Sequence, residues 1–144
     1  IVIGVDGSPH SIAALHWAVA EARVRHCPAT AVYVYPHPAA TLTADVVAGL
    51  NQALADAFFA RSRDAAEREL GALLARELAH VEDVPVEATV VAGTPAPVLV
   101  DEAADPATML VLGSRGRGGF AGLLLGSVSH QCLHHASGPV VVVP

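Results

Sequence analysis

The sequence predicts an α/β fold, namely a doubly wound five-stranded parallel sheet with helices on both faces. Five short runs rich in β-branched residues alternate with longer segments of helical composition. Several of these runs are continuously apolar, which is typical of parallel strands that are buried on both faces. Strict β-α-β alternation favours an open sheet whose strands are joined by right-handed crossovers.

Turn residues separate the expected elements along the chain. The Asp-Gly-Ser turn at 6–8 closes the first strand, and the proline pair at 36–38 opens the loop before the second helix. The long second helix contains Gly49 and Gly71, and either glycine is a point where it can break. The expected strands are Ile1–Asp6, Thr30–Tyr35, Val86–Val91, Thr108–Gly113 and Val140–Val143. The expected helices are Ser8–His26, Asp45–His80, Pro95–Ala104 and Ser127–Ala136.

Length and composition exclude several functional classes. A chain of 144 residues is long enough for one domain with a substantial core, and we assign residues 1–144 to it. The net charge of −6 argues against a nucleic-acid surface. Lysine is absent, which excludes a Walker A loop, and no apolar run reaches the ~20 residues of a membrane span. The two cysteines form no disulfide or zinc pattern, so we expect a cytoplasmic protein.

A glycine-rich loop joins the fourth expected strand to the last expected helix. It contains Gly113, Gly116 and Gly126, and Ser127 follows at once. Such a loop exposes backbone N–H groups, and the start of a helix adds unpaired N–H groups and the positive end of its dipole. The sequence therefore predicts a phosphate site here, with Ser127 as helix N-cap and Ser129 within reach of the same phosphates.

The spacing of these glycines also resembles a known motif. Gly113-x2-Gly116-x9-Gly126-Ser127 resembles the nucleotide-binding motif of the universal stress protein family, in its ATP-binding branch. The resemblance extends over nearly the whole chain. It includes the first strand and acidic turn (1–8), the Trp-Ala-x-x-Glu-Ala segment of the first helix (17–22) and the last strand (138–143).

The resemblance implies a strand order of 3-2-1-4-5 and an adenine-nucleotide site. In that order Asp6 and Gly113 end neighbouring strands at the point where the order reverses, which is where such sheets bind ligands. From the residues alone, Asp6 caps the helix that follows it. The resemblance adds a second role, in which its carboxylate contacts the ribose hydroxyls or a nucleotide-bound Mg²⁺, and both roles can hold together.

Several further residues belong to the expected site. By resemblance the backbone of Val34 reads the adenine edge, and Leu112 walls the base, although Val5 and Val34 are also ordinary core residues. Arg115 and Arg117 flank the loop, where they are either simply solvated or neutralise phosphate charge, and the family often has histidine at position 115. The complete expected set is Val5, Asp6, Val34, Leu112, Gly113, Arg115, Gly116, Arg117, Gly126, Ser127, Val128 and Ser129.

These observations lead to a functional hypothesis with two alternatives. The resemblance implies a regulator or sensor that binds ATP, or AMP or ADP, together with Mg²⁺. The first alternative is an enzyme of the same superfold, either a slow ATP hydrolase or a nucleotide-transferring enzyme. The second is a nucleotide-free interaction module. The sequence contains no nucleophile elbow and no paired carboxylates that would mark a catalytic site.

Two further features concern partners and metals. In the implied order Val140–Val143 is an apolar edge strand, and an open edge is a surface for pairing. We therefore expect a homodimer, or a tandem partner domain, through this strand.

His130 and His134 are one turn apart on the last expected helix, but no acidic third ligand accompanies them, so we assign them to the helix surface.

Overall fold

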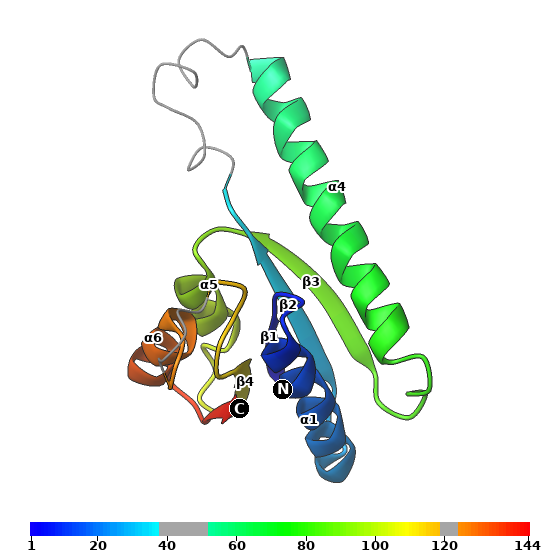
Figure 1. Cartoon of the computed structure of the whole chain (residues 1–144), viewed down its shortest axis with the longest axis vertical. Helices are drawn as coiled ribbons and strands as arrows, with labels where there is room; N and C mark the ends of the chain where they lie inside the picture. Colours follow the sequence, from blue (N-terminus) through cyan, green and yellow to red (C-terminus); the bar gives the residue numbers. More distant parts are fainter. Residues whose placement is uncertain (38–51, 119–123) are drawn as a thin grey trace.

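The computed structural model describes residues 1–37, 52–118 and 124–144. A five-stranded parallel sheet in the order β3-β2-β1-β4-β5 forms its centre (Figure 1). Its strands are β1 (Val2–Val5), β2 (Ala29–Tyr35), β3 (Val86–Ala92), β4 (Leu110–Gly113) and β5 (Val140–Val143). The predicted fold class and the predicted order are both confirmed.

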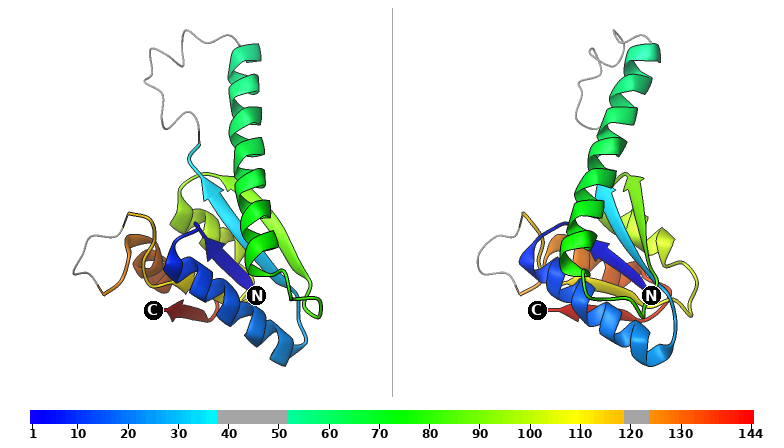
Figure 2. Two further views of the ribbon diagram at one scale, coloured as in Figure 1. Left: turned by 45° about the vertical axis from the view of Figure 1, so that its right-hand side comes forward. Right: turned by 90° about the vertical axis from the view of Figure 1, so that its right-hand side faces the viewer.

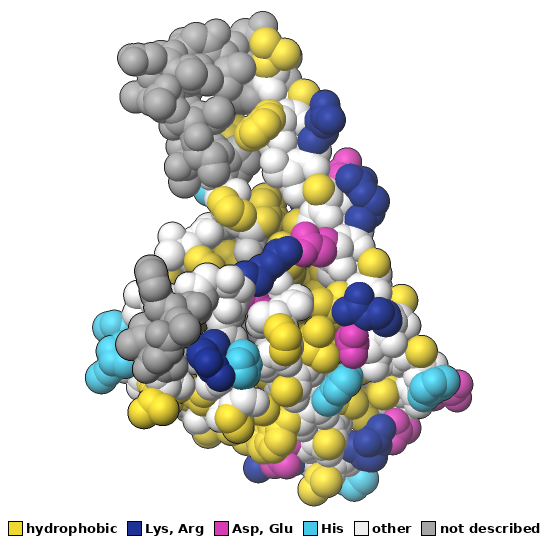
Figure 3. Space-filling view, in the orientation of Figure 1, with side chains coloured by type: hydrophobic (Ala, Val, Ile, Leu, Met, Phe, Trp, Pro, Cys, Tyr) yellow, Lys and Arg dark blue, Asp and Glu magenta, His cyan; other side chains and the backbone are white. Residues whose placement is uncertain are grey.

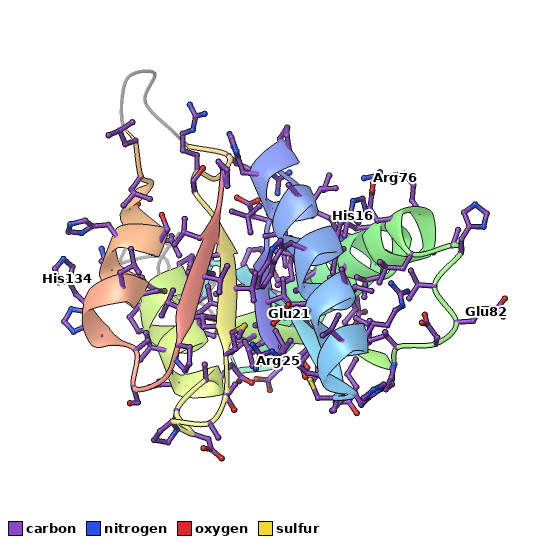
Figure 4. All side chains as sticks on the ribbon, turned by 90° about the horizontal axis from the view of Figure 1, so that it is seen from below. His16, Glu21, Arg25, Arg76, Glu82 and His134 are labelled. Carbon is purple, nitrogen blue, oxygen red and sulfur yellow. The ribbon has the colours of Figure 1, made fainter. Side chains whose placement is uncertain are left out.

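Helices cover both faces of this sheet. The described helices are α1 (Pro9–Arg25), α4 (Gln52–Glu77), α5 (Pro95–Glu102) and α6 (Ser127–His135). Viewed from below, α1 and α4 lie on one side of the strands, and α5 and α6 lie on the other (Figure 4). Each side has its own buried cluster, one around Ile3, Leu15 and Leu70 and the other around Val32, Leu99 and Leu110.

Helix α1 has well-defined ends. Ser8, expected to be the first helical residue, is its N-cap, and its Oγ accepts a hydrogen bond from the Ser11 N–H at 3.3 Å. Pro9 occupies the first turn, where its missing N–H costs nothing. His26 ends the helix in the left-handed conformation, with φ of 54°. On the outer surface Glu21 and Arg25 pair one turn apart (Figure 4).

Helix α4 is continuous through Gly71, so the expected break at this residue is wrong. A Cβ at Gly71 would have no heavy atom within 4 Å, so this glycine faces open space. A glycine inside a helix costs only about 1 kcal/mol, and the good helix formers around Gly71 together with the packing of Leu70 and Leu73 offset it. The expected residues 45–51, including Gly49, and Pro38 lie outside the described residues.

The first part of α4 extends beyond the sheet. Both views in Figure 2 show this end of the helix standing clear of the strands. Hydrophobic side chains emerge there, among them Leu54 and Phe58, while basic and acidic side chains alternate lower on the helix (Figure 3). None of the described helices has the length and apolar character that crossing a membrane requires.

The register of the central strand positions the candidate site. Val2 of β1 lies opposite Thr30 of β2 on one side and Leu110 of β4 on the other. Strand β4 begins at Leu110, two residues later than expected, because the N–H of Thr108 donates to the Asp105 carbonyl at 2.8 Å within a turn. Since β1 and β4 are parallel neighbours, the residues that follow them meet at one edge of the sheet.

Candidate nucleotide site

A cavity of about 520 Å³ opens at the carboxyl ends of β1 and β4. This is the place where the strand order reverses and where ligands bind in doubly wound sheets. Every residue of the expected site lines the cavity: Val5, Asp6, Val34, Leu112, Gly113, Arg115, Gly116, Arg117, Gly126, Ser127, Val128 and Ser129. The structure therefore brings together two segments more than a hundred residues apart in the sequence.

Part of the cavity lining is apolar, and we call this part the apolar slot. Val32, Val34 and Leu112 line it from the sheet, and Pro95 and Leu99 line it from α5. Gly4 at its floor permits close packing, because a Cβ there would lie 2.6 Å from Leu112 Cδ2. An apolar slot beside a polar loop suits a ligand with a flat ring at one end and charge at the other.

Sequence reasoning missed several lining residues. They are Gly4, Ser11, Val32, Pro95, Leu99, Gly118 and Leu125. Gly4 lies two residues before Asp6 and Val32 lies two residues before Val34, so alternation along the expected strands could have found both. Pro95 and Leu99 could be placed only once α5 was known to pack over the ends of these strands.

Asp6 links the end of β1 to the glycine-rich loop. Its Oδ1 accepts the N–H of Ser8 at 2.9 Å, and its Oδ2 accepts the N–H of Arg117 at 3.0 Å. The expected cap of α1 is therefore provided by Ser8, and Asp6 instead forms the turn before it. Burial favours a raised pKa for the Asp6 carboxyl, but hydrogen bonds from Ser8, Arg117 and Ser11 together outweigh it and lower the pKa.

The start of α6 differs from the expectation in one respect. The N-cap is Gly126, and Ser127 is the first helical residue, exposed beside the cavity. The loop folds back there because the Gly126 N–H donates to the Ser114 carbonyl at 2.6 Å. The Ser129 hydroxyl lies within hydrogen-bond distance of the same carbonyl and of the Gly126 carbonyl, so its proton is used inside the loop.

The first turn of α6 nevertheless directs donors at the cavity. Its first N–H groups, at Ser127, Val128 and Ser129, have no carbonyl one turn earlier in the helix to bind. These three residues line the cavity, and the positive end of the helix dipole adds to their field. This arrangement can bind an anion.

The two arginines of the loop differ in their surroundings. Arg115 is exposed, and its side chain makes no hydrogen bond or ion pair with another described residue. Arg117 Nη1 donates to the Tyr33 hydroxyl and to Glu69 Oε1, both at 3.1 Å. Within the described part of the chain, the Arg115 side chain therefore has only solvent as a polar partner, whereas that of Arg117 is paired.

The structure offers no centre for a protein-bound metal in the part of the chain it describes, where no group of three or more His, Cys, Asp or Glu side chains is arranged around a common point. His130 and His134 lie with ring centroids 4.7 Å apart on the exposed side of α6. Figure 4 shows His134 at the outer surface of this helix, away from the sheet.

Comparison with known proteins identifies relatives along the whole chain. The model of the universal stress protein family matches residues 1–144. A universal stress protein of Mycobacterium tuberculosis is 37% identical over 142 residues, which cover 99% of this chain and 44% of the relative. The chain thus spans about half the length of the curated relatives it matches.

Solved structures share the fold. A universal stress protein from Lactobacillus plantarum is 25% identical with a TM-score of 0.67, and the match covers 99% of this chain and 95% of that chain. A crystal structure of a universal stress protein in complex with cAMP is 28% identical with a TM-score of 0.62. This match covers 99% of this chain and 94% of that chain.

Proposed function

Because the chain belongs to the universal stress protein family, we propose that its main cavity binds an adenine nucleotide and that binding serves a regulatory or sensing role. The observation that carries this proposal is that the apolar slot, the glycine-rich loop and the first turn of α6 all line one cavity. The slot suits a base and the backbone donors suit phosphates. The relative solved with cAMP supports an adenine nucleotide as the ligand class.

ATP is the ligand we propose, and AMP and ADP would occupy the same base and sugar positions. Val32, Val34 and Leu112 would hold the base, with the backbone of Val34 at its edge. Phosphates would bind the N–H groups of the loop and of α6, since glycines at 116 and 126 leave the backbone open to close approach. Arg115 would supply positive charge beside them.

A nucleotide-bound Mg²⁺ fits the chemistry of Asp6. The lowered pKa keeps this carboxylate ionised, and each oxygen accepts one N–H and so retains a lone pair. Mg²⁺ is commonly held by one or two carboxylates together with phosphate oxygens. We therefore propose that Asp6 contacts the ion directly or through water, and that the phosphates provide the remaining ligands.

We propose binding without rapid turnover. Among the described residues that line the main cavity, Asp6 is the only carboxylate, and both its oxygens already accept backbone N–H groups. A general base must be able to take a proton from water, and a carboxylate whose pKa is lowered does this poorly. Slow hydrolysis and nucleotide transfer remain the alternative activities, and a nucleotide-free interaction module is the alternative without a ligand.

Thermal unfolding tests the nucleotide assignment. A ligand present at about 100 times its dissociation constant adds ~2.7 kcal/mol to the free energy of unfolding. For a chain of this size we expect the midpoint temperature to rise by roughly 5–10 °C with ATP and Mg²⁺. Calorimetric scans of protein first shown to be nucleotide-free would measure the shift, and an unchanged midpoint would refute nucleotide binding.

We further propose that β5 pairs with a second copy or with a tandem domain. Its far side has no neighbour among the strands of residues 1–37, 52–118 and 124–144, and the backbone groups along such an edge need partners. The register tells which groups these are. Pro139 and Val143 offer their carbonyls to β4, so by strand alternation Val141 also faces β4, while Val140 and Val142 face the open edge.

Replacing Val142 by proline is expected to weaken the dimer without breaking the β4–β5 pairing. Proline removes an N–H that points outward, whereas Val141→Pro would remove one that the sheet itself uses. Sedimentation equilibrium should show a dimer for the wild type and for Val142→Ala at tens of micromolar, and a shift to monomer for Val142→Pro. A wild-type monomer, or an equally tight dimer in the folded proline variant, would rule out this interface.

A cytoplasmic location remains a prediction based on the cysteines. Cys27 and Cys132 are both free thiols in the structure. Burial raises the pKa of the Cys132 thiol to about 11, so it stays protonated and acts as a small core side chain.

A further inference from the structure

Three polar side chains from distant elements meet beside the glycine-rich loop, and one of them, Arg117, also lines the main cavity. The Tyr33 hydroxyl of β2 lies 2.9 Å from Glu69 Oε2 of α4. Arg117 Nη1 of the glycine-rich loop lies 3.1 Å from the Tyr33 hydroxyl and 3.1 Å from Glu69 Oε1. We call Tyr33, Glu69 and Arg117 the rim cluster. None of the family motifs in this sequence includes Glu69.

The rim cluster is attached to the phosphate-binding loop through Arg117. The backbone N–H of Arg117 donates to Asp6 Oδ2 at 3.0 Å, and Arg117 lines the main cavity. Arg117 also lines a second, open hollow of about 480 Å³, which it shares with the turn at Gly7 and the start of α1. The guanidinium group therefore stands where a long side chain can turn toward either Glu69 or a ligand in the main cavity.

The ion pair between Arg117 and Glu69 is weak enough to exchange. The Arg117 side chain is 62% exposed and that of Glu69 is 46% exposed. Exposed pairs of this kind contribute little net stability, because water and salt screen the two charges. A phosphate group that offers several strong acceptors can thus replace the carboxylate as the partner of Arg117.

The charges around Arg117 indicate that such an exchange would affect which nucleotides bind. Among the described residues that line the main cavity, Arg115 and Arg117 are the basic side chains and Asp6 is the acidic one. Glu69 neutralises Arg117 and adds a second negative charge beside the loop. Each further phosphate on a ligand increases the repulsion from Glu69 and the competition for Arg117.

We infer that Glu69 is a specificity-determining residue that competes with ligand phosphates for Arg117 and so disfavours polyphosphates relative to nucleotides with fewer phosphates. This inference rests on the proposed nucleotide binding. It gives α4 a role in ligand selection, because the helix delivers a carboxylate to the loop from outside the binding motif.

Glu69→Gln tests the inference, since it removes the charge and keeps the shape. Titration calorimetry with adenosine, AMP and ATP, in EDTA and low salt, should show ATP binding about threefold to tenfold tighter than in the wild type. AMP should gain about twofold and adenosine should not change, because the effect scales with ligand charge. Raising the salt should reduce the ATP gain.

Two variants serve as controls. Glu67→Gln removes an equal charge from the same helix, but Glu67 pairs with Arg63 away from the loop, so its ligand preferences should match the wild type. Tyr33→Phe removes the hydroxyl that contacts both side chains but keeps both charges of the pair, so any gain in the ratio of ATP to adenosine affinity should stay below that of Glu69→Gln. Circular dichroism establishes that each variant is folded.

The titration results distinguish a failure of the proposed nucleotide binding from a failure of the inference about Glu69. Wild-type protein that binds none of the three ligands would contradict the proposed function and the inference together. If the wild type binds ATP, two results for Glu69→Gln would overturn the inference alone. One is that its affinities for all three ligands equal those of the wild type, and the other is that all three affinities change by the same factor. If Glu67→Gln gave the same gain in ATP affinity, the gain would come from the change in net charge alone. This result would also overturn the inference.

Discussion

Replacing Gly113 by alanine is expected to lower the free energy of unfolding by about 2–3 kcal/mol. Gly113 ends β4 directly beneath the first turn of α1, and a Cβ there would lie 2.6 Å from the His10 carbonyl carbon and 2.8 Å from the Ser11 nitrogen. These are backbone atoms, so no side-chain rotation can relieve the clash. Urea unfolding with an unchanged m-value would measure the loss of stability.

Gly71→Ala is the matched control for this substitution. The same change in α4 places the new methyl group in open space and improves the helix propensity. We expect this variant to be more stable than the wild type by about 0.5–1 kcal/mol. If Gly113→Ala were as stable as the wild type, β4 and α1 would not pack as closely as described.

The second large effect is expected for ligand binding in Gly116→Val. A Cβ at this position would lie 2.6 Å from Asp6 Oδ2, which would displace the carboxylate from the Arg117 N–H and fill the space in front of the loop backbone. We expect ATP affinity to fall at least tenfold, or about 1.4 kcal/mol. The fold should be retained, since the clash involves the end of a side chain and not the core.

Titration calorimetry on three variants tests this expectation. Gly116→Val should lose most of its ATP binding, Asp6→Ala should lose less because the phosphates keep their backbone donors, and Gly71→Ala should bind as the wild type does. Unchanged affinity in Gly116→Val would show that this part of the loop does not hold the phosphates. A greater loss in Asp6→Ala would make the carboxylate the principal contact.

The sheet could be predicted from the sequence because its signals are local. Runs rich in β-branched residues and bounded by turn residues mark the strands, and Val140–Val143 has the bounds that were expected. The strand order depended on the family resemblance, since parallel pairing leaves no local mark. The error at Gly71 arose because the surroundings of a glycine, here open solvent, are known only after the helix is packed.

The candidate site could be predicted for its backbone elements and less well for its side chains. Glycine spacing placed the loop at the correct strand end, but it could not tell that Gly126 would cap α6 in place of Ser127. Glu69 was missed for a different reason. Its approach to Arg117 depends on the rotation and tilt of a long helix, which are set by packing between distant segments.

The pairing of β1 with β4 also has a consequence for the order in which the sheet folds. Strands β1, β2 and β3 pair in the order of synthesis, but the other side of β1 stays open until residue 110 can align with residue 2. Closing so long a stretch is slow compared with local pairing. The cavity is completed only when the residues that follow β4 reach the end of β1, so the proposed ligand can stabilise this domain only after these distant strands have paired. Capture of the proposed ligand would then follow the pairing of β1 with β4 and could not assist it.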